Sequence, residues 1–156
     1  MPIYETSADR KRESSIASIL CCSWGCDAIM LPKKSIADAM LVTDEGVKAL
    51  VEIKCRGKEY DTYMISQRKI NDLKMAADMF QVKSLVVVSF PDRICYFDSA
   101  IEPDKVEKGG RTDRNDSHDV EQMNHYSVSR LKTIYKKASP EAEEWLAEYS
   151  SAPDCN

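Results

Sequence analysis

Two apolar segments separated by a short acidic turn constrain the fold of this chain more than any other feature. The first segment covers residues 35–42, the second covers residues 47–56, and residues 43–46 between them read Thr-Asp-Glu-Gly. Two β-prone runs joined by a short loop that ends in glycine are typical of a β-hairpin. Gly46 can adopt the left-handed conformation that such a loop requires. The pattern therefore predicts an antiparallel strand pair near the middle of the chain.

The register of this hairpin decides which side chains meet. If Thr43 faces Val47, Asp38 lies opposite Glu52, and a bulge at the turn would shift the pairing by one residue. Side chains alternate along a strand, so Glu52 and Lys54 share one face. The hairpin is therefore expected to bring two carboxylates and one ammonium group to the same patch of the sheet.

Such a patch needs a cation, because two neighbouring carboxylates repel each other. Mg²⁺ prefers one or two carboxylates, several waters and a substrate phosphate as ligands, and Lys54 lies close enough to reach a water or phosphate there. The alternative is an exposed hairpin with an ordinary Glu52/Lys54 pair. The apolar run at residues 49–53 argues against that alternative, since a solvent-facing strand carries more polar residues.

Asp38, followed on the next strand by Glu52-Ile53-Lys54, resembles the signature of the PD-(D/E)XK nuclease superfamily. Ala37 stands where the superfamily signature has proline. The resemblance covers about residues 6–97 and implies a restriction-endonuclease-like α/β fold, in which helices flank a central mixed β-sheet in the order α-β-β-β-α-β-β. The whole chain of 156 residues is expected to form a single domain. A C-terminal helix is predicted at residues 139–151, where Ser139-Pro140-Glu141 makes a sound helix opening.

The resemblance also implies a chemistry, which is hydrolysis of phosphodiester bonds with Mg²⁺ as cofactor and Mn²⁺ as its substitute. Asp38 and Glu52 would bind the metal together with the backbone carbonyl of Ile53. Lys54 would orient the attacking water and offset the charge that develops on the phosphate. Cleavage would leave a 5′-phosphate.

Two helices are expected to supply further site residues. The first opens at the capping box Thr6-x-x-Asp9, and Glu13 falls on or beside its apolar face. The resemblance implies that Glu13 joins the metal site directly or through water, and an ordinary intrahelical ion pair is the alternative. The second helix has Ser66 as its N-cap. The resemblance implies that Gln67, in the first turn of this helix, lies close to the scissile phosphate.

Positive side chains near these elements are candidates for DNA contacts. Lys69 lies in the first turn of the second helix and is either a phosphate contact or a solvated charge. Lys34 precedes the hairpin. Arg111 and Arg114 belong to residues 101–125, which are expected to form a flexible loop on the rigid scaffold.

Composition limits the remaining possibilities. The net charge is −4, and no window of about 18 apolar residues indicates a membrane span. No basic-then-apolar leader opens the sequence, so a cytoplasmic location is expected, in the host cytoplasm if a phage encodes the chain. The six cysteines include no Cys-x-x-Cys pair and are expected to be free thiols.

The sequence therefore predicts a Mg²⁺-dependent DNA nuclease, structure-selective or nonspecific, acting in recombination, repair or replication. A Holliday-junction resolvase, an exonuclease and a nicking endonuclease all remain open. A homodimer would favour the resolvase, and replication or recombination proteins are candidate partners. The alternative is a non-catalytic module that binds nucleic acid on the same fold.

Overall fold

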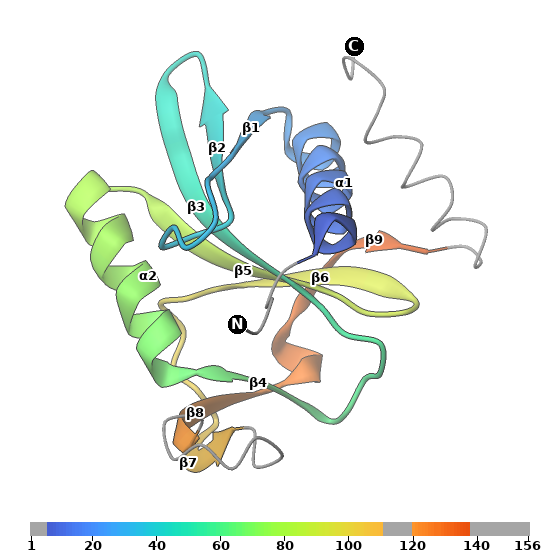
Figure 1. Ribbon diagram of the computed structural model, residues 1–156, viewed down its shortest axis with the longest axis vertical. Coiled ribbons are helices and arrows are strands. Elements are labelled where there is room, and N and C mark those ends of the chain that lie inside the picture. The colour runs from blue at the N-terminus through green and yellow to red at the C-terminus, as the bar shows by residue number, and fades with distance from the viewer. Residues whose placement is uncertain (1–5, 111–119, 138–156) are drawn as a thin grey trace.

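Two β-sheets and two helices form the framework of the molecule (Figure 1). The computed structural model describes residues 6–110 and 120–137. The elements in chain order are α1 Ser7–Trp24, β1 Asp27–Met30, β2 Ala39–Thr43, β3 Gly46–Cys55, β4 Thr62–Ser66, α2 Gln67–Phe80, β5 Lys83–Ser89, β6 Arg93–Asp98, β7 Lys105–Gly110, β8 Val120–Ser127, a 3₁₀ helix Val128–Arg130 and β9 Lys132–Lys136.

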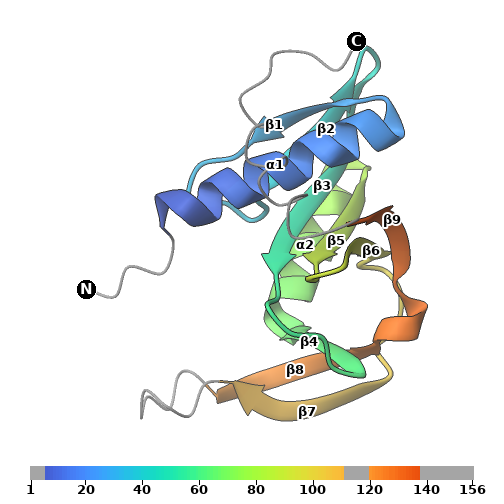
Figure 2. The same cartoon turned by 90° about the vertical axis from the view of Figure 1, so that its right-hand side faces the viewer.

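The central sheet has six strands in the order β1-β2-β3-β5-β6-β9. It is mixed, because β3 and β5 run parallel whereas all the other neighbours run antiparallel. Helix α1 covers one face of this sheet and α2 covers the other, as the two perpendicular views show (Figures 1 and 2). The predicted class, an α/β fold with a central mixed sheet flanked by helices, is confirmed.

The predicted hairpin is present as β2 and β3, with a local change at its tip. Ala39 pairs with Val51 and Leu41 with Ala49, as predicted, but Thr43 pairs with Gly46 instead of Val47. The register shifts after Leu41 because the strand opposite carries one extra residue, and this bulge leaves the inner pairs in place. The predicted register therefore holds where Asp38 and Glu52 lie.

The first strand of the hairpin is shorter than predicted. Strand β2 begins at Ala39, so the expectation that residues 35–38 belong to it is wrong. Asp38 ends the ladder because its side chain, not a backbone carbonyl, accepts the next hydrogen bond from β3, at the amide of Ile53. The preceding segment turns instead, with Lys34 at a positive φ of 66° and Leu31 N–H donating to the carbonyl of Asp38 at 2.9 Å.

Both helices begin where the sequence predicts. Thr6 and Asp9 form the capping box of α1, and Gly25 ends that helix in the left-handed conformation. The hydroxyl of Ser66 caps α2 by accepting from the backbone N–H of Lys69. Neither described helix combines the length and the apolar character that crossing a membrane requires.

A second sheet of three strands, β4-β8-β7, lies below the central sheet in Figure 2. The expectation of a flexible loop over residues 101–125 is therefore wrong at residues 105–110 and 120–125. These segments become strands because they pair with each other and with β4, and Tyr63 and Tyr126 from paired positions are buried against Phe97. Pairing between strands distant in sequence leaves little local signal.

Some predictions fall outside the described residues, namely Arg111, Arg114 and the C-terminal helix at residues 139–151.

Cys21, Cys26, Cys55 and Cys95 are free, as expected. Cys22 is disulfide-bonded, so the expectation of a free thiol is wrong at that position. Tertiary structure, not sequence spacing, brings the two cysteines of a disulfide within bonding distance.

Candidate active site

Asp38 lies where the chain enters β2, beside the middle of β3. Its Oδ2 accepts a hydrogen bond of 2.7 Å from the backbone N–H of Ile53, and its own N–H donates to the carbonyl of Val51 at 2.9 Å. These two bonds fix both the backbone and the side chain of Asp38 against β3. The carboxylate is thereby held next to the strand that carries Glu52 and Lys54.

Glu52 is a buried carboxylate, with 2% of its surface exposed. Two ammonium groups from different elements contact it. Lys54 Nζ on the same strand lies 2.7 Å from Oε1, and Lys69 Nζ on α2 lies 2.9 Å from Oε2. Lys69 also donates to the backbone carbonyl of Ile36 at 2.9 Å, so it connects α2 to the segment that precedes β2.

One oxygen of Glu52 is incompletely satisfied. Oε2 accepts no hydrogen bond within the described residues, and its contact with the Lys69 ammonium, at 2.9 Å, is an ion pair. A buried carboxylate oxygen usually has hydrogen-bond partners, and one without them is costly. The position therefore suits a further cationic ligand.

The charges of these groups act on one another. Burial raises the pKa of Asp38, and the neighbouring Glu52 carboxylate raises it further, against the opposing effects of the Ile53 N–H and of the two lysines. Burial by itself lowers the pKa of Lys54, but the carboxylates of Glu52, Asp38 and Glu13 outweigh it and raise that pKa above its usual value. The carboxylates of Asp38 and Glu52 thus repel each other, and Lys54 keeps its proton at neutral pH.

The donor set fits a hard divalent cation. Among the residues that the structure describes, no three His, Cys, Asp or Glu side chains gather as a metal cluster. Two carboxylates and a backbone carbonyl are nevertheless the kind of incomplete protein shell that Mg²⁺ takes, with waters and phosphate completing it. The carbonyl of Ile53 points to the same edge of β3 as its N–H, which is the edge at Asp38, because the two groups of one strand residue face the same neighbour.

Glu13 occupies a half-buried position on α1, and its charge acts on both Lys54 and Cys55. It is therefore near the site, but it does not complete a cluster of three carboxylates with Asp38 and Glu52.

The other predicted residues differ in their proximity to the carboxylates. Gln67 is the first residue of α2 and half-buried, and its side chain makes no hydrogen bond to Asp38, Glu52 or Lys54 in the described structure. Lys34 is exposed in the turn before Asp38. The solvated alternative for Lys69 is wrong, because its ammonium contacts Glu52.

Tyr63, for which the sequence left open a place at the edge of the site or in the core, lies on β4 and is packed in the core. It is 3% exposed, and its hydroxyl has no hydrogen-bond partner among the described residues. Burial raises its pKa, as does the charge of Glu52, whereas the Arg56 guanidinium over its ring lowers it. Only its place on β4, a strand that the sequence did not reveal, brings Tyr63 near Glu52.

Comparison with known proteins adds independent findings. A family model described as "Phage putative PDDEXK endonuclease" matches residues 1–134. Among solved structures, Hjc from Archaeoglobus fulgidus, a Holliday junction resolvase from an archaeal hyperthermophile, is similar with a TM-score of 0.54 and 14% sequence identity. The match covers 80% of this chain and 86% of that chain, and at this identity it shows a common fold. No curated protein matches the chain.

Proposed function

Because the chain belongs to the phage PD-(D/E)XK endonuclease family, we propose that it is a Mg²⁺-dependent deoxyribonuclease that hydrolyses phosphodiester bonds at Asp38, Glu52 and Lys54. The single observation that carries this proposal is the buried Glu52 carboxylate, which has an oxygen without a hydrogen bond and lies beside a second carboxylate whose pKa is raised. A site of this kind stores electrostatic repulsion that a divalent cation relieves.

Asp38, Glu52 and the Ile53 carbonyl would hold the cation, with Glu13 acting through a water. When bound, Mg²⁺ supplies Lewis-acid polarisation of a phosphoryl oxygen and lowers the pKa of a nearby water, and Mn²⁺ serves as its substitute. The proposed products carry a 5′-phosphate.

Lys54 acts as a fixed cation in this proposal. Since the neighbouring carboxylates raise its pKa in the metal-free protein, it is protonated there at neutral pH, and the proposal gives it no role as a general base. Its ammonium group instead donates hydrogen bonds, which orient the water and stabilise the negative charge that develops on the phosphate. Its contact with Glu52 Oε1 holds it in place for this role.

Residues at the margin of the site would position the DNA. Gln67, at the start of α2, would donate its amide hydrogen to a phosphate oxygen. The proposed phosphate contacts are Lys34, Lys69, Arg111 and Arg114. With a net charge of −4, binding through so few cations should be modest and sensitive to salt.

The fold shared with an archaeal Holliday junction resolvase supports a structure-selective activity in DNA recombination. A four-way junction is therefore the first substrate to test, and a homodimer is the state that symmetric cleavage of a junction would need. Replication or recombination proteins would be its partners in the host cytoplasm.

The test is a cleavage assay with linear, circular, single-stranded and four-way-junction DNA. Each substrate is incubated with Mg²⁺, with Mn²⁺ and with EDTA, and the Asp38→Asn variant is the matched control. We expect cleavage of at least one substrate with either metal, and none with EDTA or with the variant. Binding of DNA without cleavage of any substrate would instead identify a non-catalytic module.

A further inference from the structure

A cleft of about 570 Å³ opens on the α1 side of the central sheet, at the ends of β3 and β5. Ala8, Lys11, Arg12, Ser15 and Ile16 repeat at helical spacing and form the stripe of α1 that lines it. Residues 55–57 and 89–91, which end the two parallel strands, line the opposite wall together with Lys137. The carboxyl ends of parallel strands are where open α/β sheets commonly bind ligands. We refer to this feature as the basic cleft.

The lining of the basic cleft is strongly biased in charge. Among the described residues it contains Lys11, Arg12, Arg56 and Lys137 and no carboxylate, in a chain that has 26 acidic and 22 basic residues. Within the described part of the chain, Arg12 has an exposed ion pair with Asp9, at 3.7 Å, and such pairs restrain a side chain weakly. The charges of Arg12 and Lys137 both act on Cys55 between them, so these cations lie around one space. This charge distribution favours a ligand with negative charge.

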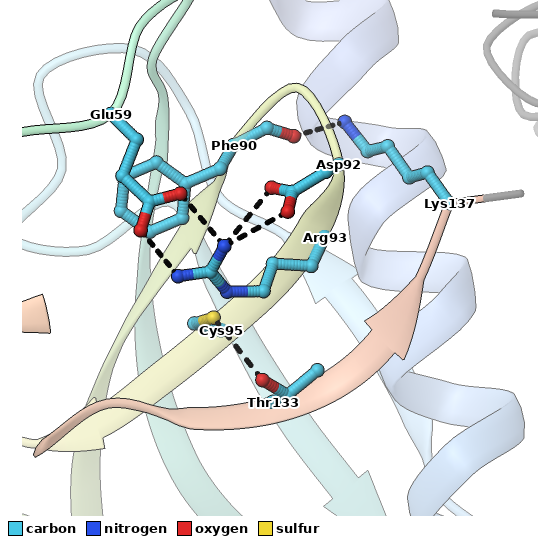
Figure 3. Close-up of polar contacts among 7 residues, drawn as sticks. All are labelled: Glu59, Phe90, Asp92, Arg93, Cys95, Thr133 and Lys137. Atoms are coloured by element: carbon cyan, nitrogen blue, oxygen red, sulfur yellow. Dashed lines mark hydrogen bonds and ion pairs between the residues drawn. The ribbon is translucent and has the colours of Figure 1, made fainter. Parts of the chain in front are cut away.

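The wall opposite α1 is fixed in place (Figure 3). Lys137 Nζ donates to the Ser89 hydroxyl at 2.9 Å and to the Phe90 carbonyl at 2.7 Å. Arg93 binds both carboxylate oxygens of Glu59, contacts Asp92, and stacks over the Phe90 ring. The turn from β5 to β6 is thereby tied to the loop after β3, which pre-forms the basic cleft and lowers the entropic cost of binding there.

The volume of the cleft and the apolar part of its lining further restrict the class of ligand that can bind. A volume of this order holds a group as large as a nucleotide and cannot admit a duplex. Ile16, Phe90 and Pro91 supply apolar surface to the same lining. Grooves that bind single-stranded nucleic acid combine these two features, positive charge for the backbone and apolar or aromatic surface for the bases.

The basic cleft adjoins the carboxylate site. Cys55 follows Lys54 directly on β3, with the two side chains on opposite faces, and the charge of Glu13 acts on both residues. Arg12, which lines the cleft, precedes Glu13 on α1. A strand that leaves the carboxylates past the end of β3 would therefore lead toward the cleft.

We propose that the basic cleft binds an unpaired DNA strand next to the bond that is cut, with phosphates at Lys11, Arg12 and Arg56 and a base against the apolar wall. This inference rests on the proposed nuclease function, and it names the form of DNA that the site takes, which is a strand with single-stranded character beside the cleavage point. Branched or frayed DNA offers such a strand, and an intact duplex does not.

The experiment measures binding separately from cleavage. Fluorescence anisotropy in EDTA compares three labelled probes, namely a single-stranded oligothymidine, the same oligomer with abasic sites, and a blunt duplex, over a range of salt concentrations. The test variant is the triple substitution Lys11→Ala, Arg12→Ala and Arg56→Ala. The matched control, Lys48→Ala, Lys83→Ala and Lys132→Ala, removes three exposed lysines away from the cleft. Circular dichroism confirms that both proteins are folded.

We expect the test variant to weaken binding of the single strand at least tenfold at low salt, and the control to change it less than threefold. The dependence of log K on log salt should become less steep by about 2, since each phosphate contact on a single strand contributes about 0.7. The abasic probe should bind wild-type protein several-fold more weakly than oligothymidine. Duplex binding should change little.

The proposal would be overturned if the two triple variants changed the affinity for the single strand equally. It would also be overturned if the test variant lost as much affinity for the duplex as for the single strand. These outcomes are independent of the cleavage assay. If the wild-type protein cuts DNA and the cleft variant still binds single strands normally, the binding role proposed for the cleft is disproved and the nuclease function is retained. A protein that cuts nothing but loses single-strand binding in the variant disproves the nuclease function and leaves the binding site standing.

Discussion

The backbone N–H of Ile53 donates a 2.7 Å hydrogen bond to Oδ2 of Asp38. This contact takes the place of the next rung in the β2–β3 ladder, so one interaction ends the strand and orients a carboxylate. It also directs the edge of β3 that carries the Ile53 carbonyl toward Asp38. Local strand pairing and the arrangement of the site are therefore the same feature of the molecule.

Substitution of Asp38 by Asn should separate activity from stability. The Asn side-chain oxygen can still accept from Ile53 N–H, while the repulsion with Glu52 disappears. Metal-dependent cleavage should fall more than about 100-fold. Substituting even a residue that only hydrogen-bonds a metal ligand typically lowers metal affinity or activity by about 10–100-fold. The metal-free variant should be more stable than wild type by about 0.5–2 kcal/mol, which is typical of relieving an unfavourable functional group.

Thermal and urea unfolding in EDTA measure that gain, and Asp38→Ala is its control. The Ala variant also lacks the acceptor for Ile53 N–H and should show no gain. Added Mg²⁺ should raise the melting temperature of wild type and leave Asp38→Asn unchanged. A less stable Asn variant would contradict the prediction.

The stability of the metal-free protein should depend on pH through Asp38. Burial, followed by the charge of Glu52, raises its pKa in the folded state above the ordinary value of 3.8. The protonated form is thus the one that the fold favours, and its stabilising contribution is complete below pH 3.8 and is lost as the pH rises through the raised pKa. Stability of wild type relative to Asp38→Asn should therefore decrease over this window and then stay constant toward neutrality.

Cleavage should follow the opposite course, because metal ligands must be deprotonated. Activity with Mg²⁺ should increase as the pH rises through the raised pKa of Asp38. Paired measurements of unfolding and of cleavage between pH 3.5 and 7 check both trends. A stability difference between wild type and variant that is independent of pH would show that Asp38 is not the group responsible.

Lys69→Met should destabilise the metal-free protein and strengthen its response to metal. The substitution removes a cation 2.9 Å from the buried Glu52 Oε2 and the donor to the Ile36 carbonyl. Loss of contacts to a buried charged group costs about 1–3 kcal/mol. Because Lys69 would compete for Glu52 with the divalent cation of the proposed site, Mg²⁺ should raise the melting temperature of the variant by more than that of wild type. Differential scanning fluorimetry with a Mg²⁺ titration measures this, and Lys74→Met on the same helix is the control.

The Arg93–Glu59 contact should stabilise the wall that it supports. Two guanidinium nitrogens bind the two oxygens of Glu59, and the side chains are 21% and 32% exposed. A bidentate pair that is partly exposed should be worth about 1 kcal/mol, between surface and buried pairs. A double-mutant cycle of Arg93→Met and Glu59→Gln, followed by urea unfolding, measures the coupling. Strictly additive losses would mean that the two residues do not stabilise each other.

Features that depend on neighbours in the sequence were predictable. The hairpin, the capping box at Thr6 and the N-cap at Ser66 are set by residues within a few positions of each other, and the structure has all three. The pairing of Asp38 with the Glu52 strand followed from the same local register. The sequence by itself thus determined that Asp38 lies beside the strand that carries Glu52.

Only the tertiary structure decided what surrounds them. Lys69 reaches Glu52 because α2 packs on that face of the sheet, and Tyr63 lies nearby because β4 pairs with β8 more than 50 residues later. The basic cleft joins α1 to the ends of two strands and to Lys137. Contacts of this kind depend on long-range packing, whose free energy is shared among many residues, and no short stretch of sequence carries enough of it to reveal them.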